Sequence, residues 1–177
     1  MIHIKIGQFQ IYTGNGKGKT TAALGLALRA SGAGYRVYFC QFIKDREYSE
    51  IKSLKLLPNV TVCQFGSGKG ILVNRDREDA DLMCAREGYE RLTRALTSGE
   101  YDVVIADEIN CALTCGLLTE AQLLKLADLR PEGTELVFTG RGATAALTDR
   151  ADLVTEMRPV KHYYETKKLP ARAGIEM

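Results

Sequence analysis

The sequence has no tryptophan, only two histidines and no apolar run long enough to cross a membrane. A membrane-spanning helix needs about 20 consecutive apolar residues, so we expect no membrane span. The first five residues, Met-Ile-His-Ile-Lys, lack the apolar core of a signal peptide. The sequence therefore predicts a cytoplasmic protein.

Cysteines are few and lack the spacing of a metal or redox motif. Their number, five, is odd, and no Cys-x-x-Cys occurs. Several lie in apolar runs, which favours small buried side chains in a reducing compartment and leaves disulfides or a metal site as the alternative. The positions are Cys40, Cys63, Cys84, Cys111 and Cys115.

The charge gives no reason to expect a nucleic-acid partner. Lysine and arginine number 24 and the acidic residues 22, a net charge of +2. Hydrophobic residues make up 45% and charged residues 26%, the usual mix of a globular protein. A chain of 177 residues is long enough for one domain that buries roughly 70% of its unfolded surface.

Short β-rich runs alternate with longer helical patterns, without repeats or linkers. This alternation predicts an α/β fold: one domain with a mostly parallel sheet of about six strands and helices on both faces. From Met157 onward the chain is basic and irregular, so composition alone predicts a loose tail. The expected strands are 8–12, 35–42, 60–65, 103–106, 135–139 and 153–156, and the expected helices 20–30, 46–57, 76–96, 117–129 and 143–150.

The run TGNGKGKT, residues 13–20, follows the phosphate-loop (P-loop) pattern G-x-x-x-x-G-K-[ST] except that Thr13 replaces the first glycine. Glycines let the backbone come close to a phosphate, and free amides at a helix start attract anions. Lys19 would bring a positive charge, Lys17 a second one, and the Thr20 hydroxyl suits Mg²⁺. We expect a polyphosphate site, with a plain glycine-rich turn as the alternative.

Two further strand ends support such a site. Residues 103–108, VVIADE, form a buried strand that ends in Asp107 and Glu108, where a carboxylate can reach Mg²⁺. Glu108 could instead be a hydrolytic base. Arg141 lies between two glycines after the fifth strand, where it can contact a phosphate or ribose or remain an exposed turn residue.

The motif set resembles the P-loop ATP:corrinoid adenosyltransferases of vitamin B12 biosynthesis. The matching segments are GNGKGKTT, QFIK (41–44), DEIN (107–110), TGRG, DLVTEMRPVKHYYE (152–165) and ARAGIE. The resemblance implies a single RecA-like P-loop NTPase domain, residues 1–177, with a C-terminal segment (residues 157–177) that folds over the active site. It also implies a homodimer served by an electron-donating flavoprotein reductase.

The implied reaction transfers the adenosyl group of ATP to Co(I) of cob(I)yrinic acid a,c-diamide or cob(I)alamin and releases triphosphate. Lys19, Thr20 and Glu108 would be the catalytic residues, and Thr20, Asp107 and Glu108 would hold Mg²⁺. The implied nucleotide-binding residues are Gly14, Asn15, Gly16, Lys17, Gly18, Lys19, Thr20, Thr21 and Arg141.

The sequence departs from the family on the corrinoid side. Some members carry a Phe-x-Trp pair that displaces the axial ligand of cobalt, whereas this chain has GSGKGI at residues 66–71. Ile71 and Leu72 could form an aliphatic wedge, Tyr48 or Phe65 could act instead, or the substrate could lack the lower base. No Asp-x-His-x-x-Gly motif that ligates cobalt occurs.

Two other classes of function remain. A P-loop ATPase or small-molecule kinase would use Glu108 as its base and would produce ADP. A corrinoid or nucleotide binding module would bind ATP without turnover, which the missing aromatic pair makes conceivable.

Overall fold

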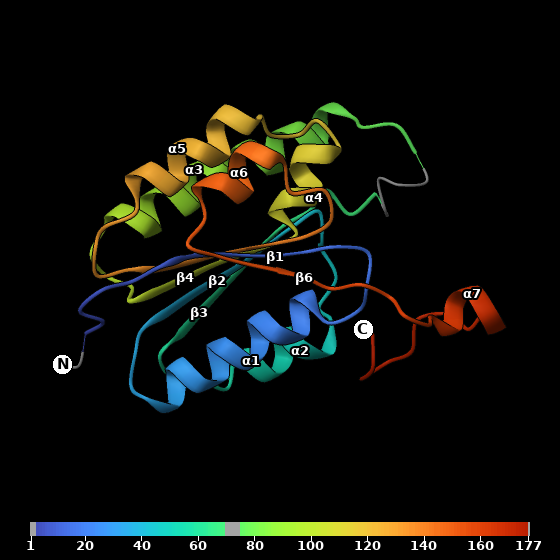
Figure 1. Ribbon diagram of the computed structural model, residues 1–177, viewed down its shortest axis with the longest axis horizontal. Helices are drawn as coiled ribbons and strands as arrows, with labels where there is room; N and C mark the ends of the chain where they lie inside the picture. Colours follow the sequence, from blue (N-terminus) through green and yellow to red (C-terminus); the bar gives the residue numbers. More distant parts are fainter. Residues whose placement is uncertain (1–2, 70–74, 177) are drawn as a thin grey trace.

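The computed structural model describes residues 3–69 and 75–176 and has three layers, with the sheet in the middle (Figure 1). The strand order is β3-β2-β4-β5-β1-β6, and every neighbouring pair is parallel. The predicted α/β fold with a parallel six-stranded sheet is confirmed. The strands are Phe9–Thr13 (β1), Val37–Phe42 (β2), Val60–Phe65 (β3), Val103–Asp107 (β4), Glu135–Thr139 (β5) and Leu153–Glu156 (β6).

Helices cover both faces of the sheet. Figure 1 shows α1 and α2 on one face and α3, α4, α5 and α6 on the other, with α7 outside the layers. The bounds are Lys19–Gly32 (α1), Ser49–Leu54 (α2), Asp79–Thr97 (α3), Ile109–Thr114 (α4), Glu120–Leu129 (α5), Ala145–Arg150 (α6) and Tyr163–Lys167 (α7). Within the described residues, no helix is both long and apolar enough to span a membrane.

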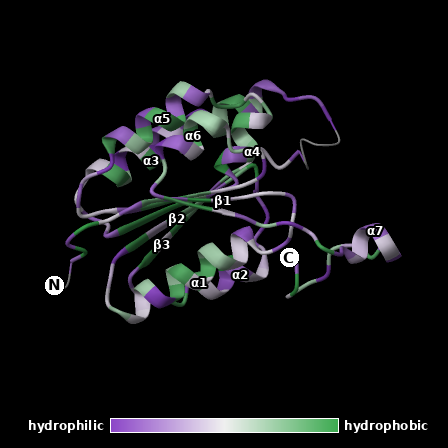
Figure 2. Cartoon of the chain, in the orientation of Figure 1, coloured by the Kyte–Doolittle hydropathy of each residue, from purple (hydrophilic) through white to green (hydrophobic). Residues whose placement is uncertain are grey.

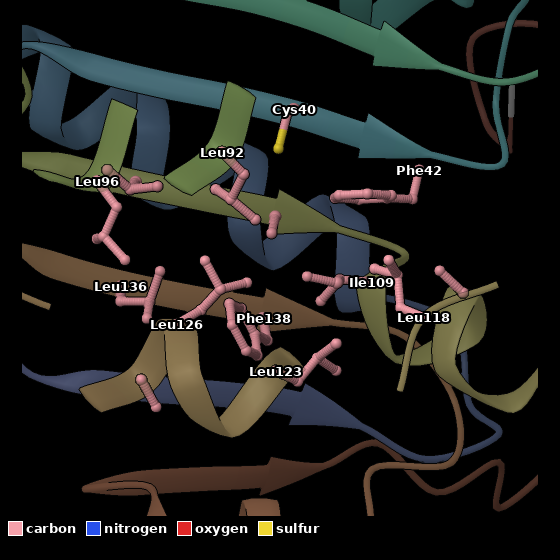
Figure 3. Packing of buried hydrophobic residues seen from close by; sticks show 14 of the residues in the cluster. Cys40, Phe42, Leu92, Leu96, Ile109, Leu118, Leu123, Leu126, Leu136 and Phe138 are labelled. Carbon is pink, nitrogen blue, oxygen red and sulfur yellow. The ribbon is translucent and has the colours of Figure 1, made fainter. Parts of the chain in front are cut away.

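The larger core lies between the sheet and helices α3 and α5 (Figure 3). Leu92, Leu126 and Phe138 are fully buried there, and the Phe138 ring meets the Phe9 ring edge-on at 4.9 Å. On the other face Ala23 and Ala27 have no exposed surface, so α1 packs closely on the strands. Figure 2 accordingly shows hydrophobic strands between helices of mixed hydropathy.

Some helix predictions need correction. The predicted helix 46–57 is helical only over Ser49–Leu54, because only Ile51 and Leu54 supply a buried face and Leu56 is 83% exposed. The predicted helix 117–129 begins at Glu120, where Thr119 and Gln122 form a capping box. The pattern does not predict α4, a single short helix directly after β4.

The C-terminal segment is ordered rather than a loose tail. It follows β6 and contains α7, which composition alone does not predict. Figure 2 colours α7 mainly hydrophilic or neutral, and none of its residues is buried. Contacts with the P-loop, described below, therefore hold this segment in place.

Candidate nucleotide site

The P-loop joins β1 to α1 at the carboxyl edge of the sheet. The strand order places the ends of β2, β4, β5 and β1 side by side, so the residues that follow each strand meet at this edge. Here lies a cavity of about 740 Å³ that residues 15–21 line together with Glu108 and Arg141. The structure thus brings most of the predicted nucleotide-site residues together.

Glycine is required at specific P-loop positions. Gly14 and Gly18 have φ angles of 94° and 121°, which other residues rarely adopt. The Gly16 amide donates to the Met157 carbonyl at 2.6 Å, and a Cβ on Gly16 would lie 2.6 Å from the same oxygen. The loop therefore packs directly against the start of the C-terminal segment.

Thr13 replaces the first consensus glycine because the turn has not yet begun there. Thr13 is the last residue of β1, paired in register with Glu156 of β6. Its hydroxyl accepts a hydrogen bond from the Ala143 amide at 3.4 Å. The first left-handed residue is Gly14, so a threonine is compatible with the backbone at position 13.

The Lys19 ammonium group folds back onto its own loop. It donates to the carbonyl oxygens of Gly14 at 2.8 Å and Gly16 at 2.7 Å. Burial lowers the pKa of Lys19, and the nearby Glu108 carboxylate offsets only part of this effect. Lys19 is therefore already in the loop, where a phosphate would bind.

Thr20 and Asp107 are in direct contact. The Thr20 hydroxyl donates to Asp107 Oδ1 at 2.8 Å, and Thr139 donates to the same oxygen at 2.6 Å. Asp107 is fully buried, and its Oδ2 accepts from Gln41 Nε2 at 3.0 Å. A hydroxyl beside a carboxylate fits Mg²⁺, which commonly takes one or two carboxylates plus phosphate oxygens and waters. No cluster of three acidic, histidine or cysteine ligands occurs in the described parts of the chain, so phosphate would have to complete the set.

Glu108 lines the cavity from a strained position. Its φ is 61°, a left-handed conformation that costs a residue other than glycine about 1–3 kcal/mol and is typical of functional sites. Its amide donates to the Thr139 hydroxyl at 3.0 Å, which stabilises this turn. The turn brings the carboxylate to the cavity.

All five cysteines are free; Cys40 is buried, as expected, and the other four are partly buried. Cys111 lies closest to the site: its Sγ accepts from the Arg141 amide at 3.3 Å. Burial, reinforced by Glu108, raises the pKa of the Cys111 thiol to about 12. Cys111 therefore remains a neutral thiol at physiological pH.

Arg141 reaches the cavity from a turn after β5. Gly140 and Gly142 on either side have φ angles of 123° and 75°, and a Cβ on Gly140 would lie 2.9 Å from the Cys111 amide nitrogen. The turn thus needs both glycines. It places an exposed guanidinium at the same cavity as Lys19.

The structure describes two of the four residues predicted for the corrinoid side, Tyr48 and Phe65. Phe65 is 5% exposed and packs in the core, 5.8 Å from the Phe42 ring. Tyr48 caps α2, and its ring centroid lies 5.7 Å from Lys44 Nζ. Ile71 and Leu72 lie outside the described residues. Of the two predicted residues that the structure describes, Tyr48 lies beside Lys44, which lines the cavity.

One wall of the cavity comes from the C-terminal segment. Glu176 Oε1 lies 2.9 Å from Lys17 Nζ, and the Tyr163 hydroxyl lies 3.2 Å from the same nitrogen. Hydrogen bonds from Arg172, then Tyr163 and Lys17, hold the pKa of Glu176 well below its usual value. The GIE and HYYE motifs signalled this segment, but the sequence does not identify the Lys17 contact.

These features define a P-loop nucleotide-binding protein. A glycine loop joins a strand to a helix, and its Lys19 and Thr20 lie beside Asp107 at the end of β4. Solved structures share the fold. The flagellar accessory protein FlaH of Methanocaldococcus jannaschii has a TM-score of 0.62 at 17% identity, over 86% of this chain and 72% of that one. EssC (ATPases 2 and 3) of Geobacillus thermodenitrificans has a TM-score of 0.51 at 16% identity, over 96% of this chain and 36% of that one.

The family model for ATP:corrinoid adenosyltransferase BtuR/CobO/CobP matches residues 5–177, so the chain belongs to this family. The corrinoid adenosyltransferase of Escherichia coli K12 is 33% identical over 94% of this chain and 83% of that protein. CobA of Salmonella typhimurium matches with the same identity and coverage. The uncharacterized protein all2391 of Nostoc sp. is 35% identical over 97% of this chain, which spans only 48% of that protein.

Proposed function

We infer that this chain transfers the 5′-deoxyadenosyl group of ATP to Co(I) of a corrinoid and releases inorganic triphosphate. The observation that carries the inference is the Thr20–Asp107 contact beside Lys19, at a 740 Å³ cavity in a chain of this family. The substrate is cob(I)yrinic acid a,c-diamide or cob(I)alamin.

The chemistry explains why cations dominate the site. The electron pair of Co(I) forms the bond to the 5′ carbon, the carbon–oxygen bond breaks, and triphosphate leaves with that bond's electron pair. Cobalt is formally oxidised to Co(III). No proton has to be removed, so no general base is needed. The protein contributes alignment of the reacting atoms and charges placed in advance for the leaving group.

We propose that Lys19 and the amides of residues 15–21 hold the triphosphate. Thr20, Asp107 and Glu108 would hold Mg²⁺, and the donor oxygens described above fit that ion. When bound, Mg²⁺ offsets negative charge on the leaving triphosphate. Arg141, which also lines the cavity, adds a nucleotide contact.

Further proposals follow from the family. The C-terminal segment closes over bound ATP, which its place in the cavity wall supports. The protein acts in the cytoplasm as a homodimer and receives electrons from a flavoprotein reductase.

An ATPase or kinase with Glu108 as base is the weaker hypothesis, because the matched relatives with an assigned activity are corrinoid adenosyltransferases.

One assay separates the candidate functions. The protein receives ATP, Mg²⁺ and a chemically reduced corrinoid, while absorbance follows the cobalt–carbon bond and phosphorus NMR identifies the product. Adenosyl transfer yields the alkylcorrinoid and triphosphate in equal amounts. ADP with phosphate would point to an ATPase, and bound but unreacted ATP to a binding module.

A further inference from the structure

Lys44 is a cation at the cavity that the P-loop does not supply. It follows β2, and it lines the same cavity as Lys19 and Arg141. Its side chain is 25% exposed, and its Nζ lies 3.5 Å from Asp107 Oδ2. Neither the P-loop pattern nor the paired acids account for it.

A strained turn fixes the position of Lys44. Ile43, the preceding residue, has a φ of 66°, which is an outlier for a β-branched residue. Its amide donates to the Phe65 carbonyl at 3.0 Å. Opposite the turn, a Cβ on Gly66 would lie 2.6 Å from the Lys44 carbonyl carbon, so only glycine leaves room. The chain thus maintains an unfavourable backbone conformation next to this lysine.

The strand order shows what Lys44 adds. β4, which ends at Asp107, lies between β2 and β5, and β1 follows β5. Arg141 and the P-loop therefore lie on one side of Asp107, and Lys44 lies on the other. A polyphosphate that extends from the P-loop across the end of β4 would meet Lys44 at its far side.

The contacts of Lys44 are looser than those of the loop lysines. Lys19 donates to two loop carbonyls within 2.8 Å, and Lys17 pairs with Glu176 at 2.9 Å. The 3.5 Å contact of Lys44 with Asp107 is long, and Gln41 already donates to the same oxygen at 3.0 Å. The oxygens of Asp107 therefore have hydrogen-bond donors besides Lys44, and Lys44 reaches this carboxylate only through a long ion pair.

We propose that Lys44 binds the triphosphate chain of ATP on the side of Asp107 opposite the P-loop and stabilises it as it leaves. The identity of the leaving group rests on the proposed function. The ammonium group of Lys44 would then bind a phosphate oxygen of the polyphosphate. Its ion pair with Asp107 would be secondary to that contact.

The test measures binding of inorganic triphosphate with Mg²⁺ by calorimetry, which requires no corrinoid. Lys44→Met should weaken binding about tenfold or more, since it removes a charge-assisted contact. Lys44→Arg should restore most of the affinity. Lys55→Met is the matched control, because Lys55 pairs with Glu47 at 2.6 Å outside the cavity and should not affect binding. Lys44→Gln provides a second neutral variant if the methionine variant folds poorly.

Orthophosphate separates a polyphosphate contact from a structural role. A contact at the far end of the chain predicts a much larger loss for triphosphate than for orthophosphate. Two results would overturn the proposal. In the first, both neutral variants bind triphosphate within twofold of wild type. In the second, the variants lose equal affinity for triphosphate and orthophosphate.

Wild-type turnover keeps the two hypotheses apart. If the wild type adenosylates a corrinoid and the neutral variants bind triphosphate normally, the proposed role of Lys44 is wrong and the proposed adenosyl transfer is supported. If triphosphate binding depends on Lys44 but no cobalt–carbon bond forms, the polyphosphate site stands and the transfer is wrong.

Discussion

Lys17 and Glu176 form an ion pair of 2.9 Å although 159 positions separate them in the sequence. Tyr163 contacts both side chains, and Arg172 contacts Glu176. A carboxylate of the C-terminal segment thus pairs with a P-loop lysine. Because a phosphate carries the same sign of charge as Glu176, we expect bound ATP to weaken this ion pair.

Glu176→Gln should loosen the C-terminal segment. The change removes the charge that pairs with Lys17 and Arg172, so limited proteolysis beyond β6 should become faster without nucleotide. We expect an increase of about threefold, since exposed ion pairs contribute little each. Glu165→Gln, on α7 but outside the cavity lining, is the control. Equal cleavage of both variants would show that the pair does not hold the segment.

Lys19→Ala should lower turnover with ATP and a reduced corrinoid by about 10²–10³, the loss typical when a preplaced charge-stabilising group is removed. The protein should remain folded, because the hydrogen bonds of Lys19 to described residues go to carbonyls of its own loop. Initial rates of alkylcorrinoid formation measure the effect. Lys125→Ala, exposed on α5, should retain wild-type rates. Near-normal turnover of the Lys19 variant would remove the P-loop from the mechanism.

Glu108→Gln should raise about tenfold the Mg²⁺ concentration that gives a half-maximal rate of alkylcorrinoid formation. A neutral amide is a poorer Mg²⁺ ligand than a carboxylate. Titration of Mg²⁺ at saturating ATP measures this. At high Mg²⁺ much of the activity should return. A variant that remains inactive at every Mg²⁺ concentration would favour a hydrolytic base, and Glu120→Gln on α5 serves as the unaffected control.

Asp81 predicts an acid dependence of stability. Its carboxylate accepts two bonds from Arg75, at 2.7 and 2.8 Å, and one from the Glu78 amide at 2.9 Å. The Arg75 guanidinium, helped by Ser67 and Glu78, holds the pKa of Asp81 well below its usual value. A carboxyl with a depressed folded-state pKa stabilises the fold above the unfolded value of about 3.9 and loses that effect as pH falls below it.

Asp81→Asn should therefore lower the free energy of unfolding at pH 7 by about 1 kcal/mol, a modest value because solvent screens Arg75. The difference from wild type should shrink between pH 5 and pH 3. Urea denaturation at pH 7, 5 and 3 measures it. A constant difference across this range would show that charge is not the cause.

Much of the fold is predictable from local pattern. Strands β3, β5 and β6 have the predicted bounds, because apolar runs between turn residues mark them. Helices α4 and α7, of six and five residues, are not predicted by the sequence pattern, although α2 and α6, of six residues each, lie within predicted helices.

The same distinction applies to the site. Lys19, Thr20 and Asp107 belong to short motifs, and the structure brings them together. Lys44 and Gln41 fall in the QFIK segment that matches the family, but no local pattern reveals the left-handed conformation of Ile43 next to Lys44. Gln41 reads as one residue of an apolar strand, yet its bond to Asp107 crosses 66 positions.

Met157 links the end of β6 to the nucleotide loop in both directions. Its amide donates to the Thr13 carbonyl at 2.9 Å, and its carbonyl accepts from Gly16 at 2.6 Å. The base of the C-terminal segment is thus clamped to the loop. If the C-terminal segment moves while these two hydrogen bonds stay intact, its pivot lies after Met157.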